Sequence, residues 1–445
     1  MSSEQTVVDR RATSSKNLLS RRDFLKLGGA GLAGVAALGA PGCGGGGGQN
    51  SGTVIFSFQP DWSGSIHRLL EKFNKQNKGK FQVAYREIDL ASQEYFDRLK
   101  TEFQAGGGET DVIGGDVPWT AEFAENGWIV DVSSRFPKGD RSKFVNGQIR
   151  SLTYESKIWG VPWDAVAGLL FYRRDLLEQS GFSEPPQTWE ELKVMAKKVV
   201  QDSNTKYGFV FQGANNETGV CNGLEYIWTH GGEVLDGDRV IIESPESVAG
   251  LATEQSMISD GVTPQAVASY TMFESDAAFL EGEAVFCRNW PYMYAGAGDP
   301  ESKVKRDQVG VSPLPVGEGH SQTASCLGGF NMLIDASSEM QDEAWEFVQF
   351  MTSEKSQKVY SISTVSAPTL NTLYDDREIL EEVPVVALSK EALQNARPRP
   401  VSPYYSQMSR TMAEQFNKVL TGATSPEGAV ETLQSELQQI IEEGS

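Results

Sequence analysis

Aromatic side chains beside proline, glycine or aspartate recur in segments that the sequence predicts to be loops. Loops lie on the protein surface, so an aromatic ring held there needs a reason to be exposed to water. A pyranose ring supplies one, because its C–H face packs on a flat aromatic ring while its hydroxyl rim needs carboxylate, amide or guanidinium partners. The alternative for any single ring is that it fills the edge of a local core. The segments are 61–62, 116–119, 161–164, 289–292 and 328–330.

The motifs of the common enzyme classes do not occur in this sequence. There is no G-x-S-x-G nucleophile turn, no G-x-x-x-x-G-K-[ST] phosphate loop and no H-E-x-x-H zinc motif. The three histidines, His67, His230 and His320, are far apart along the chain, which leaves little material for a metal centre or a histidine-activated nucleophile. The sequence therefore predicts no enzyme, no metal and no cofactor. A secreted glycoside hydrolase stays open as the alternative, because its two carboxylates are distant in sequence.

The chain is long and acidic. Its 445 residues predict at least two globular lobes. With 39 Lys and Arg against 60 Asp and Glu, the formal net charge is −21, which offers no positive field to a phosphate backbone. Nucleic acid is therefore not an expected partner.

The N-terminal residues resemble an export signal, predicted over residues 1–42. Residues 20–26 read S-R-R-D-F-L-K, which is similar to the twin-arginine signal, and the apolar run after them is short and rich in Gly and Ala. Cys43 precedes five glycines, which resembles a bacterial lipoprotein site in which Cys43 carries the lipid and residues 43–52 form a tether. The alternative is release by ordinary signal cleavage.

Three cysteines follow Cys43 in the sequence: Cys221, Cys287 and Cys326. In an exported protein two of them can close one disulfide and leave one thiol. The sequence does not select the pair.

Short apolar strands alternate with amphipathic helices, which is typical of an α/β fold with covered sheets. Near the N-terminus this alternation gives a βαβαβ unit. A second α/β unit begins where Thr188 and Glu191 form a capping box before a helix. The predicted strands are 53–58, 81–88, 111–113 and 207–212. Helical spacing is found in 66–73, 96–103, 192–200, 340–351, 408–419 and 426–441.

Several motifs resemble those of the family 1 extracellular sugar-binding proteins of ABC importers. G-G-G-E-T-D-V at 106–112, D-V-P-W at 116–119 and F-A-E-N-G-W-I at 123–129 are similar to the general family pattern. Other stretches resemble the trehalose/maltose-binding branch of that family. They are W-G-V-P-W at 159–163, G-L-L-F-Y-R at 168–173, R-N-W-P-Y at 288–292 and R-P-V-S-P-Y-Y at 399–405.

The resemblance covers nearly all of the chain after residue 53 and implies a fold. This is the two-lobed, type II periplasmic-binding-protein-like fold, in which two α/β lobes are joined by hinge strands and the ligand lies in the cleft. The N-terminal lobe is expected to comprise residues 53–164 and about 329–368. The C-terminal lobe, with the C-terminal helices, is expected to comprise residues 165–328 and about 369–445.

The resemblance also implies a ligand site. Trp290 is expected to be the stacking platform and Tyr292 a second wall of the site. Arg399 is expected to donate to ring hydroxyls, although a surface arginine held between two prolines is the alternative. Gly329 and Phe330 are expected at the hinge, where they would give a backbone N–H and a ring edge.

The remaining expected ligand-binding residues are mostly acidic. Asp116 is expected to accept from sugar hydroxyls, with a helix cap as the alternative. Asp61 and Arg86 are expected to reach in from the first lobe. Glu274 resembles an acidic cleft residue of the trehalose binders, with a solvated loop carboxylate as the alternative.

One position departs from the family pattern. Val166 stands where relatives often have an aspartate, and Asp164 is expected to substitute for it from a shifted position. This leaves the identity of the sugar open. Trp163, beside Asp164, is proposed as another surface on which a sugar rests.

The predicted function is that of the extracellular sugar-binding component of an ABC importer. It would capture a disaccharide such as trehalose or maltose, or a related α-glucoside, by hinge closure and deliver it to the membrane permease. The expected partners are a mono- or disaccharide, the permease subunits and, through a lipid on Cys43, the membrane; the protein is expected to be a monomer. Besides the hydrolase, the alternatives are an adhesion module and a binding protein for a non-sugar solute such as glycerol phosphate.

Overall fold

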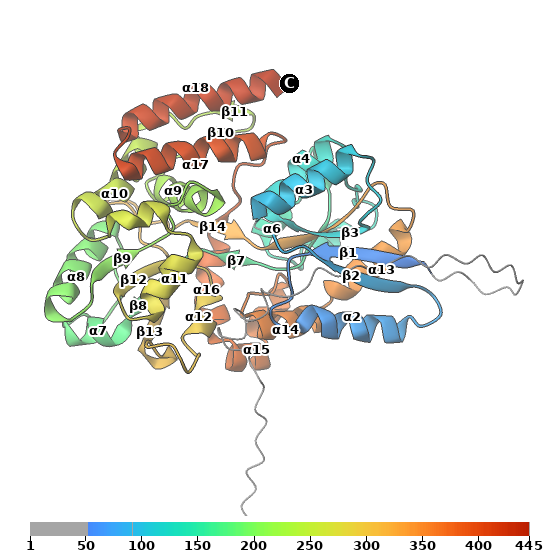
Figure 1. The fold of residues 1–445 in the computed structure, drawn as a ribbon, viewed down its shortest axis with the longest axis horizontal. Coiled ribbons are helices and arrows are strands. Elements are labelled where there is room, and N and C mark those ends of the chain that lie inside the picture. The colour runs from blue at the N-terminus through green and yellow to red at the C-terminus, as the bar shows by residue number, and fades with distance from the viewer. Residues whose placement is uncertain (1–51, 91, 445) are drawn as a thin grey trace, which may run out of the picture. The chain divides into compact units, whose positions relative to one another are not determined.

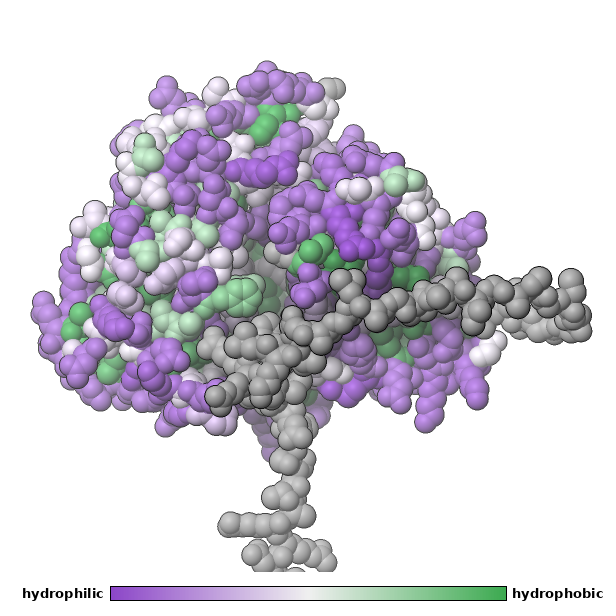
Figure 2. Space-filling model, viewed as in Figure 1, coloured by the Kyte–Doolittle hydropathy of each residue, from purple (hydrophilic) through white to green (hydrophobic). Residues whose placement is uncertain are grey.

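The computed structural model describes residues 52–90 and 92–444 (Figure 1). The predicted signal peptide, Cys43 and most of the glycine tether lie outside the described residues. Within them, no helix has the length and apolar character needed to cross a membrane. Figure 2 shows a face on which hydrophilic residues predominate, with apolar residues in scattered patches.

A five-stranded mixed sheet is built from the first part of the chain and one later strand (Figure 1). Its strand order is β2-β1-β3-β15-β6; β1 is parallel to β2 and β3, whereas β15 is antiparallel to β3 and β6. The predicted βαβαβ unit is therefore confirmed. The strands are β1 (Thr53–Phe58), β2 (Gln82–Glu87), β3 (Val112–Asp116), β6 (Val161–Pro162) and β15 (Phe330–Ile334).

Amphipathic helices accompany this sheet. In α2 the buried residues recur at helical spacing, as the sequence predicts, and α13 packs against both α2 and β15. The helices of this part are α2 (Ser65–Gln76), α3 (Ser92–Gln104), η1 (Val117–Trp119), α4 (Thr120–Glu125), α5 (Lys138–Arg141), α6 (Asn146–Ser151), α13 (Gln341–Met351) and α14 (Glu354–Thr364). A small hairpin pairs β4 (Thr153–Tyr154) with β5 (Lys157–Ile158).

A four-stranded mixed sheet follows, in the order β13-β8-β12-β9. The predicted capping box is present, because Thr188 accepts from the Glu191 backbone N–H while Glu191 accepts from the backbone of Thr188. The strands are β8 (Leu169–Arg173), β9 (Tyr207–Val210), β12 (Ala284–Asn289) and β13 (Val309–Ser312). The neighbouring helices are α7 (Arg174–Gln179), α8 (Trp189–Asp202), η2 (Gln265–Ser269), α11 (Met272–Leu280), α12 (Met293–Gly296) and η3 (Arg306–Gln308).

A group of four helices packs together around a second apolar core. The predicted C-terminal faces are confirmed, since Met408, Met412, Phe416, Val419 and Leu433 are all buried. These helices are α9 (Glu217–Thr229), α10 (Pro245–Ser259), α17 (Tyr405–Thr421) and α18 (Pro426–Gly444), with the hairpin β10 (Leu235–Asp236) and β11 (Arg239–Val240) beside them. The remaining elements are η4 (Asn371–Asp375), α15 (Arg377–Glu382) and α16 (Pro384–Gln394).

The chain passes twice between the two large sheets through a three-stranded sheet, which we call the crossover. One pass runs from β6 to β7 and the other from β14 to β15, where Gly329 separates the two strands. Gly329 has φ +108°, and a Cβ on it would lie 2.2 Å from the carbonyl oxygen of Asp164, so the two passes touch where only glycine fits. The crossover strands are β7 (Val166–Ala167), β14 (Ser325–Gly328) and β16 (Ala396–Arg397).

The cysteines Cys221, Cys287 and Cys326 are free thiols, and all three are buried. Cys326, on β14, lies beside Cys221 of α9, and burial followed by this contact raises the pKa of the Cys326 thiol well above its usual value. The sequence does not select which two of the three cysteines are neighbours. The structure brings Cys221 and Cys326 together.

Candidate functional site

Arg399 joins the five-stranded sheet to the four-helix group. Its Nη2 donates to Asp116 Oδ1 at 2.7 Å and its Nη1 to Glu217 Oε1 at 2.6 Å, and the residue is only 4% exposed. Asp116 ends β3, whereas Glu217 begins α9. We call this pair of ion pairs the Arg399 bridge. Because the guanidinium is buried, the surface-arginine alternative is wrong.

Asp116 serves the bridge and not a helix cap. Its side chain makes no capping hydrogen bond to η1, so that alternative is also wrong. Its second oxygen accepts from Ser92 Oγ at 3.0 Å, which fixes the carboxylate against α3.

Glu217 is a member of the site that sequence reasoning missed. Besides Arg399, its carboxylate accepts from the Tyr405 hydroxyl at 2.5 Å and from the Ser409 hydroxyl. The R-P-V-S-P-Y-Y stretch thus supplies both the cation and a donor to the same carboxylate. Glu217 itself gives no local signal, because it follows Asn216 at an ordinary capped helix start.

The electrostatics of the bridge favour its charged form. Burial opposes the charge on Arg399, but the carboxylates of Asp116 and Glu217 outweigh it and the pKa of Arg399 is raised well above its usual range. Arg399 Nε has no hydrogen-bond acceptor among the described residues. One donor of a fixed guanidinium therefore remains for a ligand oxygen.

Trp290 lies where β12 ends, next to the crossover. Arg288 Cζ is 4.1 Å from the centroid of its ring, and a Cβ on Gly328 would lie 3.3 Å from the ring edge. Arg288 is in turn fixed by Glu225, with donor–acceptor distances of 2.7 and 2.5 Å inside the core. Since Arg288 covers one face of the half-buried ring, only the other face can serve as a stacking platform.

Tyr292 is close to Trp290 in sequence and partly buried. Its buried hydroxyl lies near Asn289 but makes no hydrogen bond of standard geometry among the described residues, and burial raises the pKa of this phenol. A buried hydroxyl without a well-formed hydrogen bond is costly, so a ligand that bonded to it would remove that cost.

Trp163 does not offer an open face in this conformation. It is 1% exposed and packs on Phe58 and Tyr360, with ring centroids 4.9 and 4.6 Å away. The expectation of a sugar surface at Trp163 is therefore corrected: this ring fills the core, which is the alternative stated for any single aromatic residue.

Asp164, Gly329 and Phe330 form the contact between the two passes of the crossover. The Phe330 N–H donates to the Asp164 carbonyl at 3.1 Å. The backbone N–H and ring edge expected of Gly329 and Phe330 stay a prediction. The Asp164 carboxylate is 5% exposed, and burial raises its pKa to about 6 although Ser366 and the Ala165 N–H favour the charged form. Its side chain belongs to the interior of the crossover.

Glu274, Asp61 and Arg86 serve local structure. Glu274 is exposed and accepts from the hydroxyl and the backbone N–H of Thr271 in the capping box of α11, which lowers its pKa. It is therefore a solvated carboxylate at a helix start and not in a loop. Asp61 accepts hydrogen bonds from backbone N–H groups in the first turn of α2. Arg86 forms ion pairs with Glu102 and Glu109. As far as the structure describes the chain, no hydrogen bond joins any of the three to Asp116, Arg399 or Trp290. Their expected place in the cleft is therefore not seen in this conformation.

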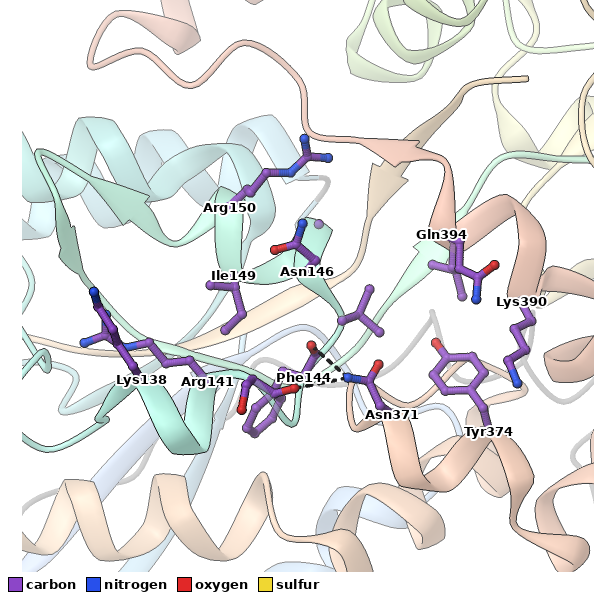
Figure 3. Close-up of a pocket in the computed structure, with 14 residues that line it drawn as sticks. Lys138, Arg141, Phe144, Asn146, Ile149, Arg150, Asn371, Tyr374, Lys390 and Gln394 are labelled. Atoms are coloured by element: carbon purple, nitrogen blue, oxygen red, sulfur yellow. Dashed lines mark hydrogen bonds between the residues drawn. The ribbon is translucent and has the colours of Figure 1, made fainter. Parts of the chain in front are cut away.

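Two cavities bear on the site. The one beside the Arg399 bridge, lined by Ser92, Glu217 and Tyr405 among others, has a volume of about 10 Å³, enough for about one water molecule and too small for a sugar ring. A cavity of about 780 Å³ lies elsewhere and is lined by none of the expected ligand-binding residues (Figure 3). A sugar at the bridge therefore requires a more open arrangement.

Comparisons with known proteins agree with this architecture. The sequence profile of the bacterial extracellular solute-binding proteins matches residues 59–358. A "probable ABC transporter-binding protein" of Deinococcus radiodurans is 33% identical over 341 residues, which are 75% of this chain and 80% of that protein.

Solved structures are similar over most of the chain. The maltose-bound MalE3 of T. maritima has a TM-score of 0.80 and 34% identity, covering 87% of this chain and 100% of that one. The GacH receptor of Streptomyces glaucescens has a TM-score of 0.77 at 24% identity, covering 88% of this chain and 99% of that one, a likeness that shows the fold alone. The predicted fold class, the two-lobed type II α/β fold, is confirmed.

The first prediction concerns the Arg399 bridge. Arg399→Met should lower the free energy of unfolding by about 3 to 5 kcal/mol, because it leaves two partly buried carboxylates without their cation. Urea unfolding measures the change. Arg410→Met is the matched control, since Arg410 is exposed on α17. Adding Glu217→Gln to Arg399→Met should recover part of the loss; a loss no larger than that of Arg410→Met would contradict the assignment.

The second prediction concerns Asp164 and pH. Because its pKa is raised on folding, its contribution to stability is full below the unfolded value of 3.8 and is lost as pH rises to about 6. Asp164→Asn should therefore be more stable than the wild type at pH 7, by up to about 3 kcal/mol, with a difference that shrinks towards pH 4. Urea unfolding at several pH values measures it. A pH-independent difference, or one equal to that of the exposed Asp238→Asn, would show that Asp164 is not buried as a charge.

Proposed function

The chain belongs to the bacterial extracellular solute-binding protein family, and from this premise we propose that it captures a sugar for an ABC importer. The Arg399 bridge is the observation that carries the proposal. It places one buried guanidinium, with a donor left over, between elements that pack around different cores. Trp290, half-buried at the end of β12 beside the crossover, would supply the apolar surface that a pyranose ring needs.

The proposed mechanism is a shift between open and closed arrangements. Sugar contacts to both lobes would stabilise the closed arrangement, and the permease would recognise that form. The proposed lobes are residues 53–164 with about 329–368, and 165–328 with about 369–445. The location of the two passes, between β6 and β7 and between β14 and β15, supports the boundaries at residues 164 and 329.

A disaccharide such as maltose or trehalose, or a related α-glucoside, is the proposed ligand. The maltose-bound T. maritima protein, similar over 87% of this chain, supports the class. Stacking on the face of Trp290 opposite Arg288 would supply affinity. Arg399 Nε and the Tyr292 hydroxyl would supply specificity, because a buried polar group that a ligand leaves unpaired costs about 1 to 3 kcal/mol.

The proposed location is outside the cytoplasmic membrane, as the extracellular family implies. The twin-arginine pattern at residues 20–26 supports export in the folded state, and Cys43 before five glycines supports a lipid anchor. We also propose that the protein acts as a monomer with the permease as its partner.

The third prediction is that a sugar stabilises the folded protein. A thermal-shift panel of trehalose, maltose, sucrose, glucose, glucosylglycerol and oligosaccharides tests it. A sugar at about a thousand times its dissociation constant should add about 4 kcal/mol of stability, because it binds only the folded state. Trp290→Ala should abolish this stabilisation while the protein stays folded, and Trp290→Phe should restore part of it by keeping a ring.

The outcomes separate the alternatives. Turnover of a disaccharide would indicate a glycoside hydrolase. A flat response to every sugar, with a shift by glycerol phosphate or an oligopeptide, would indicate a non-sugar solute, and no response to any small molecule would indicate an adhesion module. Unchanged sugar affinity in Trp290→Ala would remove this residue from the site.

A further inference from the structure

The 780 Å³ cavity is separate from the Arg399 bridge and forms a groove beside the crossover (Figure 3). One wall is made by α5, α6 and the segment between them, and the other by η4 and α16. We call it the basic groove. Its volume lies within the range of small-molecule sites, about 300 to 1,000 Å³.

The groove carries positive charge on a strongly acidic protein. Lys138, Arg141, Arg150 and Lys390 all line it, and no aspartate or glutamate is among the described residues of the lining. Figure 3 shows these side chains spread around the rim, with Lys138 and Arg141 at one end and Lys390 at the other. On a chain of net charge −21, four cations around one cavity form a local field that favours an anion.

The cations of the groove are only partly neutralised. Arg141 donates to the carbonyls of Phe136 and Ser133, at 2.6 and 3.1 Å, and Arg150 donates to the carbonyl of Ala396 at 3.4 Å. Those bonds orient the two guanidinium groups without cancelling their charge. In the described part of the chain, neither arginine nor Lys138 is ion-paired to a carboxylate, whereas Lys390 pairs with Asp375 at 3.3 Å.

Carboxylates nearby in the described chain form no ion pair with Arg141. Asp140, on the same short helix as Arg141, pairs with Lys143 at 2.7 Å. Against the effect of burial, Ser133, Lys157 and Arg141 together lower the pKa of Asp131, but no ion pair joins Asp131 to Arg141 among the described residues. Among the described residues, three of the four cations that line the groove therefore make no ion pair with a carboxylate.

The remaining lining suits a small polar molecule. Asn146, Asn371 and Gln394 present amides, and Asn371 is fixed by its bond to the Phe144 carbonyl at 3.1 Å. The floor includes Phe144, Ile149 and Leu393. Amides and an apolar floor give room for the uncharged part of a ligand, while the arginines match phosphate oxygens in two-point contacts.

We propose that the basic groove binds a small phosphate-bearing molecule. The site is distinct from the sugar site, since none of the residues proposed for the sugar lines it. Its two walls pack on different sheets: α6 contacts β6, and α16 contacts β13 and β7. An occupant of the groove therefore touches elements on both sides of the crossover.

The fourth prediction tests this site with inorganic pyrophosphate as the probe. Isothermal titration of the full chain at low ionic strength should show one saturable site. Lys138→Gln/Arg150→Gln should weaken it about tenfold or more, because it removes two cations that would form charge-assisted hydrogen bonds to phosphate oxygens. Both residues are exposed, so the variant should fold. Lys72→Gln/Lys197→Gln, with the same charge change on exposed positions of α2 and α8, should bind as the wild type does.

The site is overturned by the absence of saturable pyrophosphate binding at millimolar concentration, or by equal weakening in both double variants, which would show a general charge effect. The outcome is independent of the sugar proposal. Trp290→Ala should bind pyrophosphate normally, and Lys138→Gln/Arg150→Gln should keep its response to sugars. Loss of both ligands in one variant would show that the two sites are the same.

Discussion

A buried guanidinium must be neutralised, and this requirement organises the molecule around Arg399. The charge is satisfied by Asp116 from the end of β3 and Glu217 from the start of α9, at 2.7 and 2.6 Å. Neither carboxylate alone would place the side chain, since each belongs to a different layer. The bridge thus fixes the position of the five-stranded sheet relative to the four-helix group, beside the crossover.

A second buried ion pair supports the proposed stacking surface. Glu225 of α9 fixes Arg288, and Arg288 covers one face of Trp290. Both ion pairs therefore depend on α9, which supplies Glu217 and Glu225 eight residues apart. Removing either partner of such a pair leaves an uncompensated charge, so the site and the stability of the fold are linked.

The sequence predicts local features well and distant pairings poorly. The βαβαβ unit, the Thr188 capping box and the apolar face of α17 follow from spacing within one segment, and each is confirmed. Glu217 is missed because its partners lie about two hundred residues away. Trp163 is misplaced for another reason: a loop-like motif does not reveal that its ring packs on Phe58.

The central claim is that a sugar closes two lobes around the crossover. Small-angle X-ray scattering of the protein, with and without a saturating concentration of the most stabilising sugar, tests it most directly. The radius of gyration should fall in the wild type and stay constant in Trp290→Ala under the same conditions. An unchanged radius of gyration in wild-type protein that is shown by calorimetry to be saturated with sugar would contradict closure.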